Sequence, residues 1–221
     1  MSENKGYKVI AIVALMLGVV GVTLGYAAFT STLTISSSAE VKPSSANFNV
    51  DFSSSSSSVL TAAIQPELTP STPVEGFTAT DATISNSGDP TITNLHATFT
   101  QPGQSVTYRF YSYNAGEYVA YLNKITFSGT KSCTAKAVES PATPATQSLV
   151  NAACNGISLS VKVGSDDPTT SSIASLTNHT LGINAAEEVV VTISYAQDAA
   201  VADGDFDVTL PSIVLTYDSV E

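Results

Sequence analysis

The feature that most constrains this chain is a long uncharged segment near its start. No charged residue lies between Lys8 and Glu40, and residues 9–29 contain a single clearly polar side chain, Thr23. A helix of this length reaches about 30 Å, the thickness of the hydrocarbon core of a bilayer. Lys5 and Lys8 precede the segment, and positive flanks stay in the cytoplasm. We therefore expect the residues that follow to be exported.

Two fates of this N-terminal helix are open. Gly25 and Ala27 place small residues where a signal peptidase reads them, which predicts cleavage between Ala27 and Ala28. The apolar run is also longer than the usual signal-peptide core of about 7 to 15 residues, which favours a permanent membrane anchor over residues 9–29. The first reading leaves an extracellular protein, and the second leaves a cell-surface protein tethered to the membrane.

A type IV pilin-like subunit is a third and less favoured reading. The prepilin cut would follow Lys5-Gly6. The charged Lys8 would then stand at the second mature position, and Ala11 would replace the glutamate expected at the fifth.

Composition narrows the remaining sequence to one exported domain over residues 28–221. The net charge is −11, and such a surface repels nucleic acid and anionic lipid headgroups. The membrane is therefore expected as a partner only through an uncleaved N-terminal helix. Only 12% of residues are charged, while serine, threonine and β-branched residues are abundant. This composition is typical of β proteins.

Period-two alternation of apolar and polar residues dominates from Thr32 onward, which indicates half-buried strands. The clearest run is Val189-Val191-Ile193-Tyr195, and about nine such segments are present. We predict an all-β fold, an antiparallel β-sandwich of jelly-roll or immunoglobulin-like type. It would be preceded by one N-terminal hydrophobic helix.

Turn residues separate the predicted strands. Gln101-Pro102-Gly103-Gln104 suits a type II turn, and Asn114-Ala115-Gly116-Glu117 predicts a hairpin. Residues 135–153 contain two prolines and many small residues, so we expect a long irregular excursion. Residues 168–184 are expected to hold at most one short helical turn.

The two cysteines, Cys133 and Cys154, are predicted to form a disulfide, because an even pair in an exported domain is normally oxidised. Closing a loop of about 20 residues should stabilise the fold by roughly 3 kcal/mol. Neither cysteine has a neighbouring histidine or a second cysteine at CxxC spacing, so we expect no metal or redox role.

Motifs for catalysis are weak. The histidines, His96 and His179, lie in unrelated segments, and no GxSxG occurs. We therefore expect no enzyme activity and no cofactor. Asp203, Asp205 and Asp207 have the spacing with which a calcium loop begins, but no glutamate closes it, so we expect an acidic hairpin tip. Calcium binding there stays open.

An aromatic-rich segment offers a contact face. In the strand that includes residues 106–113, Tyr108 and Phe110 are expected to point into the core. Tyr111 and Tyr113 are predicted to form an exposed row that contacts partner subunits or ligands. Arg109 is expected on the same side as Tyr111.

The N-terminus resembles a known family. The segment Leu24-Gly25-Tyr26-Ala27-Ala28-Phe29-Thr30 is similar to the signal sequences that a SipW-type peptidase processes in the TasA and camelysin family of exported matrix proteins. The turn at residues 101–104, the strand with Val106, Tyr108 and Phe110, and the following residues 114–116 are also like that family's "PG, alternating strand, N-x-G" order. The specific likeness covers about 35 residues at the N-terminus and about 20 in the middle of the chain.

This resemblance implies a non-enzymatic subunit of biofilm-matrix fibres, which self-associates by passing its N-terminal strand into the next subunit. Residues 28–41 would be the donor strand, with Leu33 and Ile35 filling apolar pockets of the neighbour. The cysteine pair departs from the family pattern. The alternative function is a membrane-anchored surface domain that acts as an adhesin or binding module.

Overall fold

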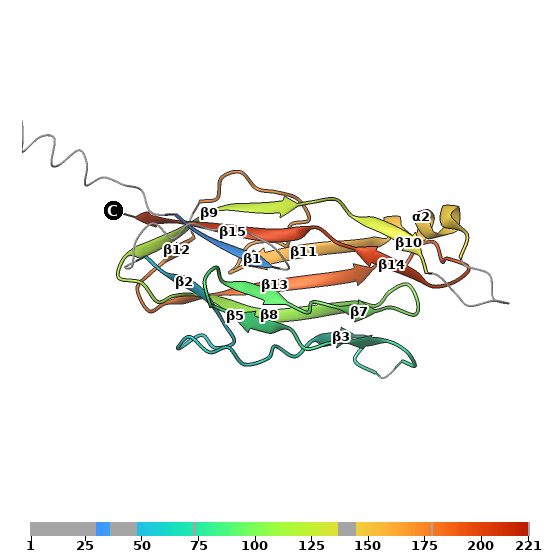
Figure 1. Ribbon diagram of the computed structural model, residues 1–221, viewed down its shortest axis with the longest axis horizontal. Helices are drawn as coiled ribbons and strands as arrows, with labels where there is room; N and C mark the ends of the chain where they lie inside the picture. The colour runs from blue at the N-terminus through green and yellow to red at the C-terminus, as the bar shows by residue number, and fades with distance from the viewer. Residues whose placement is uncertain (1–29, 36–47, 73, 137–144, 178, 221) are drawn as a thin grey trace, which may run out of the picture.

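The computed structural model describes residues 30–35, 48–72, 74–136, 145–177 and 179–220. The described residues are mostly β, with two larger sheets that overlap in the view of Figure 1 and two small ribbons of two strands each. The predicted N-terminal helix, the cleavage position at Ala27 and Ala28, and most of the expected donor segment lie outside the described residues.

One layer, which we name the upper sheet, has six strands. Its strand order is β12 (Thr180–Leu181), β9 (Val119–Ser128), β15 (Ser212–Val220), β1 (Thr30–Ile35), β6 (Thr91–Thr93) and β5 (Thr83–Ser85). All of its neighbours pair antiparallel except β1 and β6, which are parallel.

The other layer, which we name the lower sheet, has five strands. Its path is β11 (Ile157–Val163), β13 (Ala186–Tyr195), β8 (Ser105–Asn114) and β2 (Val50–Ser53), and β3 (Glu67–Thr69) also pairs with β8. The two ribbons are β10 (Ser132–Ala135) with β14 (Phe206–Thr209), and β4 (Thr78–Ala79) with β7 (Ala97–Thr98).

The buried faces of both larger sheets contribute to one apolar cluster. Alternation sets which residues point inward: on β8, Val106, Tyr108 and Phe110 are fully buried while their neighbours are not. From the other sheet, β15 contributes Ile213 and Leu215 to the same cluster. The expected core role of Tyr108 and Phe110 is confirmed.

The chain crosses from one sheet to the other after Asn114, so the predicted hairpin at residues 114–117 is wrong. Strand β8 belongs to the lower sheet and β9 to the upper one. Asn114 is fully buried and holds this crossing, because its side-chain amide donates to the carbonyls of Tyr118 at 2.8 Å and Leu181 at 2.9 Å. A buried amide with these partners favours a bend between sheets over a tight two-strand turn.

The turn at residues 101–104 has the expected glycine geometry. Gly103 has φ +88°, a conformation that favours glycine. Gln104 is almost fully buried, and its side-chain oxygen accepts the backbone N–H of Thr100 at 2.7 Å and of Gln101 at 3.2 Å. The side chain thereby closes the turn that leads into β8.

The expected irregular excursion at residues 135–153 is wrong in its later part. Helix α2 (Gln147–Asn155) follows Thr146 and buries Val150, Ala153 and Cys154. Thr146 is held in place by Asp203, whose two carboxylate oxygens accept the Thr146 backbone N–H at 2.8 Å and its hydroxyl at 2.6 Å. Residues 168–177 and 179–184 contain β12 but no α-helix.

A disulfide joins Cys133 on β10 to Cys154 on α2, as the sequence predicts, with the two Cα atoms 6.0 Å apart. It fastens the helix to the ribbon of β10 and β14 at the right-hand end of the molecule in Figure 1. The bond closes a loop of 21 residues.

Replacing both Cys133 and Cys154 by serine should lower the free energy of unfolding by about 3 kcal/mol, because the unfolded chain regains the entropy of the open loop. The measurement is denaturant unfolding of the protein, and reduction of the natural bond should reproduce the loss. An unchanged midpoint in both experiments would contradict a stabilising disulfide.

Candidate assembly and contact sites

Strand β1 occupies an interior position in the upper sheet although it is the first described segment of the chain. It pairs antiparallel with β15 over six residues, from Thr30 opposite Asp218 to Ile35 opposite Ile213. On its other side it pairs in parallel with β6, where Thr34 faces Thr91 and Ile35 faces Ile92. The slot between β15 and β6 is therefore filled by a strand from the chain's own N-terminal region.

The pairing register shows which positions of β1 stand beside buried residues of β15 and which stand beside partly exposed ones. Leu33 and Ile35 stand opposite Leu215 and Ile213, which are buried in the core. Thr32 stands opposite Thr216, which is partly exposed. Because cross-strand partners share a face, Leu33 and Ile35 occupy core-side register positions.

Strand β11 lies at a border of the lower sheet and has much of its outer edge already bonded. The ammonium group of Lys131 donates a hydrogen bond to the carbonyl of Ile157 at 2.6 Å. Val161 and Thr169 form two backbone hydrogen bonds with each other, from the N–H of each residue to the carbonyl of the other. The carbonyl of Val163 accepts from the N–H of Asp166. These contacts occupy backbone groups that would otherwise pair with an added strand.

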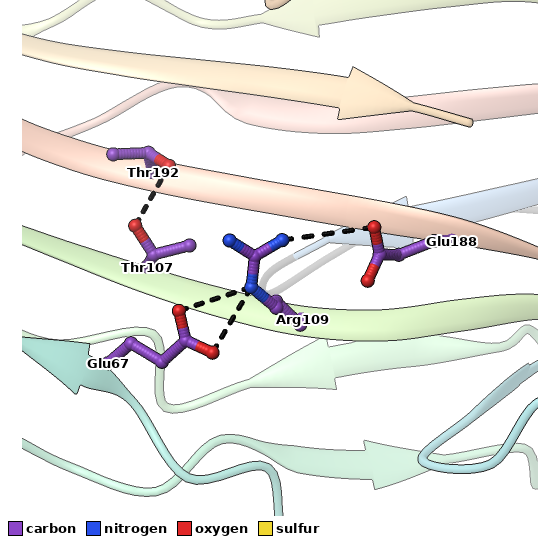
Figure 2. A network of polar contacts seen from close by, with 5 residues as sticks. All are labelled: Glu67, Thr107, Arg109, Glu188 and Thr192. Carbon is purple, nitrogen blue, oxygen red and sulfur yellow. Dashed lines mark hydrogen bonds and ion pairs between the residues drawn. The ribbon is translucent and has the colours of Figure 1, made fainter. Parts of the chain in front are cut away.

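The outer face of β8 carries a polar network that links three strands of the lower sheet (Figure 2). Arg109 donates through Nε to both carboxylate oxygens of Glu67 on β3 at 3.1 Å, and its Nη1 lies 3.8 Å from Glu188 on β13. Thr107 and Thr192 share a hydrogen bond of 3.1 Å beside it. These side chains are half exposed, so the ion pairs contribute only a few tenths of a kcal/mol to about 1 kcal/mol.

Only one of the two tyrosines predicted to form an exposed contact row is partly exposed. Tyr111 is partly exposed and stands in register with Glu188 and Ser53. Tyr113 is buried, with 7% of its surface exposed, which contradicts its expected exposure. Its register partners are Asp51 on β2 and Ala186 on β13, so neighbouring strands flank it on both sides. A contact role for Tyr111 stays a prediction.

Asp203, Asp205 and Asp207, which have the spacing of a calcium loop, make different contacts in the structure. Asp203 binds Thr146 through both carboxylate oxygens, and these hydrogen bonds lower its pKa below the ordinary value of 3.8. Asp205 accepts the N–H of Lys136 through its backbone carbonyl, and Asp207 lies on β14 opposite Thr134. Within the described ranges, no three His, Cys, Asp or Glu residues are grouped to hold a metal ion.

Sequence reasoning missed an ionic cluster around the buried His179, in which Asp166 is half exposed and Glu187 is mostly buried. His179 is 4% exposed, and its two ring nitrogens lie 2.8 Å from the carboxylates of Glu187 and Asp166. Burial tends to lower the pKa of His179, but the hydrogen bonds and charges of Glu187 and Asp166 raise it above the ordinary value of 6.5. The separations of 8 and 13 residues match no local motif, so the sequence holds no signal for this cluster.

Among the residues that the structure describes, no helix is long and apolar enough to cross a membrane. The apolar residues 9–29 are not among them. No protein-family model matches the chain, and no curated protein or solved structure is detectably similar to it.

Replacing Leu33 by aspartate should lower the free energy of unfolding by about 2–4 kcal/mol, since the register puts this position on the core side of β1 and an unpaired charge there is costly. Thr32→Asp is the matched control, with the same charge one residue away on the opposite face, and should cost about 0.5 kcal/mol or less. The comparison uses denaturant unfolding of the two variants and the unmodified protein. Equal losses in the two variants would contradict the register of β1.

Proposed function

We propose that this protein is a non-enzymatic structural subunit of an extracellular matrix, with a β-sandwich domain that polymerises by donation of β1 into the next subunit. The two larger sheets would be the halves of a jelly-roll or immunoglobulin-like sandwich. The observation that carries the proposal is the interior place of β1 between β15 and β6, because this strand comes from the chain's N-terminal region and not from the body of the domain.

The slot requires a strand. Without β1, the backbone groups of β15 that face it would have no partner, and Ile213, Leu215 and Ile92 would lose the apolar neighbours that the register places beside them. An unpaired, apolar strand edge is a template for another chain. The same residues of a second copy satisfy it with identical hydrogen bonds and identical side chains, so donation between copies costs little apart from the entropy of association.

The position of β1 in the chain favours such an exchange. Thr30 follows the predicted cleavage position at Ala27 and Ala28 by only two residues, so processing would free the end of the strand. Residues 28–39 carry no charge and are poorly suited to stand alone in water. A second copy offers the nearest matching site for them.

A paired-cysteine experiment tests donation directly. One exported chain carries Thr34→Cys and a second carries Val214→Cys, the register partner of Thr34 on β15. Mixing the two should give a disulfide-linked heterodimer under mild oxidation, because a donated β1 brings the two thiols from different chains into adjacent positions. The readout is a non-reducing gel together with negative-stain microscopy of the unmodified fibres.

The matched control pairs Thr34→Cys with Thr126→Cys. Thr126 faces Val214 from β9, one strand further from β1, so donation does not place it beside Thr34. Heterodimers with Val214→Cys but not with Thr126→Cys support donation. Absence of both, with a Thr34→Cys/Val214→Cys double variant that cross-links only within one chain, would show that β1 stays in its own subunit.

The alternative function is a membrane-tethered adhesin or binding module that uses the face around Arg109 and Tyr111. It differs from the proposal because the N-terminal segment would stay uncleaved. The proposal predicts that protein recovered from its host begins at Ala28, as read by N-terminal sequencing, because donation needs a free strand end. An intact Met1 on the exported protein would instead favour the tether through residues 9–29.

A further inference from the structure

The His179 cluster joins the two larger sheets along one side. His179 immediately precedes β12 at the border of the upper sheet, and its carbonyl accepts the N–H of Leu122 on β9. Its carboxylate partners belong to the lower sheet: Glu187 lies on β13, and Asp166 lies in the turn that follows β11. We name the three residues Asp166, His179 and Glu187 the clasp.

The clasp requires a proton on the imidazole. A neutral histidine has one N–H and one lone pair, so it can donate to only one of the two carboxylates, whereas the protonated ring donates to both. Both contacts measure 2.8 Å, which fits charge-assisted hydrogen bonds. The same contacts raise the pKa of His179, so the clasp is complete below about pH 6.5 and is lost as the pH rises through that raised pKa.

The inner carboxylate of the clasp, Glu187, is the register partner of Ser112 on β8. Both residues act on the fully buried Tyr217 of β15, the strand that pairs with β1. Burial is the main cause that raises the pKa of Tyr217, the Ser112 hydroxyl lowers it, and the negative charge of Glu187 raises it further. Tyr217 in turn is the register partner of Ser31 on β1, next to a register shift between Thr216 and Tyr217.

This end of the core contains several polar atoms that lack partners. The buried atoms Ser112 Oγ, Tyr217 Oη and Glu187 Oε2 make no hydrogen bond of good geometry among the described residues, although the Ser112 hydroxyl lies close enough to Tyr217 to lower its pKa. The Glu187 side chain is 20% exposed, but its Oε2 is buried and unpaired, so the carboxylate depends on the countercharge at its other oxygen, which is the His179 ring. Loss of that countercharge leaves an uncompensated and largely buried anion near Tyr217.

We infer that the clasp is a protonation switch that controls how firmly β1 is held in its slot. Charged His179 locks the two sheets together, and its deprotonation loosens β15 at Tyr217, where the first half of β1 is paired. The titratable groups around the switch are Asp166 from the turn after β11, Glu187 from β13 and Tyr217 from β15. As regulation of strand donation, the inference rests on the proposed function, but release of β1 within one chain is measurable without polymerisation.

A tryptophan in β1 reports on the switch, since the chain has no natural tryptophan. Thr32→Trp places the reporter opposite the partly exposed Thr216. Fluorescence of the exported protein in denaturant should show β1 leaving its slot at lower denaturant concentration at about pH 9 than at about pH 6. We expect the ratio of released to bound strand to rise about tenfold over this range, which corresponds to about 1.4 kcal/mol.

Two variants in the same reporter background assign the effect. His179→Gln carries no charge at either pH and should abolish the pH dependence. Asp167→Asn removes one carboxylate next to Asp166 but outside the clasp, and should leave the dependence unchanged. If His179→Gln does not fold, Asp166→Asn keeps the inner contact with Glu187, and the pH dependence should then shift to lower pH. An NMR titration, with His96→Gln for assignment, should place the pKa of His179 above its ordinary value of 6.5.

The outcomes separate the two proposals. A release of β1 that is independent of pH, or equally dependent in His179→Gln, overturns the switch whether or not fibres form. A pH-dependent release that His179→Gln abolishes supports the switch even where the paired-cysteine experiment finds no donation, which would overturn only the proposed function.

Where donation occurs, heterodimers should accumulate faster after preincubation at about pH 9 than at about pH 6 when both samples are oxidised at one common pH.

Discussion

Strand β15 needs a hydrogen-bonding neighbour on each side, and on one side that neighbour is β1. Its other neighbour, β9, is joined to it through a long antiparallel ladder. The inward residues Ile213, Leu215 and Tyr217 are among the most buried side chains of the molecule, so β15 lies at the centre of the core. The completeness of the upper sheet thus depends on six residues that reach it from the chain's N-terminal region.

The packing between the two sheets determines how they are placed relative to each other. The core between the sheets is apolar over most of its length, with Phe52 and Phe110 packed edge to face at 5.3 Å between ring centroids. At one end the buried side chains become polar, with Asn114 at the crossing between sheets and His179 in its clasp. Apolar packing tolerates small shifts, whereas buried hydrogen bonds and ion pairs require one geometry. The polar end therefore fixes how the two sheets meet.

Much of the β architecture could be predicted from the sequence because alternation with period two survives in the long strands. The segments that became β8, β11, β13 and β15 follow it closely, with inward residues such as Val191 and outward residues such as Thr192. The pairing of Cys133 and Cys154 could also be predicted, since no other cysteine is present. Local patterns of this kind report on a strand and its faces, but not on which sheet the strand enters.

The missed features depend on contacts that are distant in the sequence. Asn114 looked like a turn residue, yet its amide bonds a carbonyl 67 residues away. Helix α2 is short and rich in small residues, and it is fastened by Asp203 and by a disulfide from another ribbon. Tyr113 alternates correctly to the outer face but is covered by its neighbours. No residue in the clasp has a local partner that would have marked it.

The bonds along the outer edge of β11 affect the shape of any assembly. Lys131, Thr169 and Asp166 occupy its backbone groups, which discourages pairing of subunits side by side through this edge. The proposed donation of β1 would instead add each subunit at the end of the last one. A polymer built under these two conditions lengthens as a thin thread and resists broadening into flat, amyloid-like ribbons.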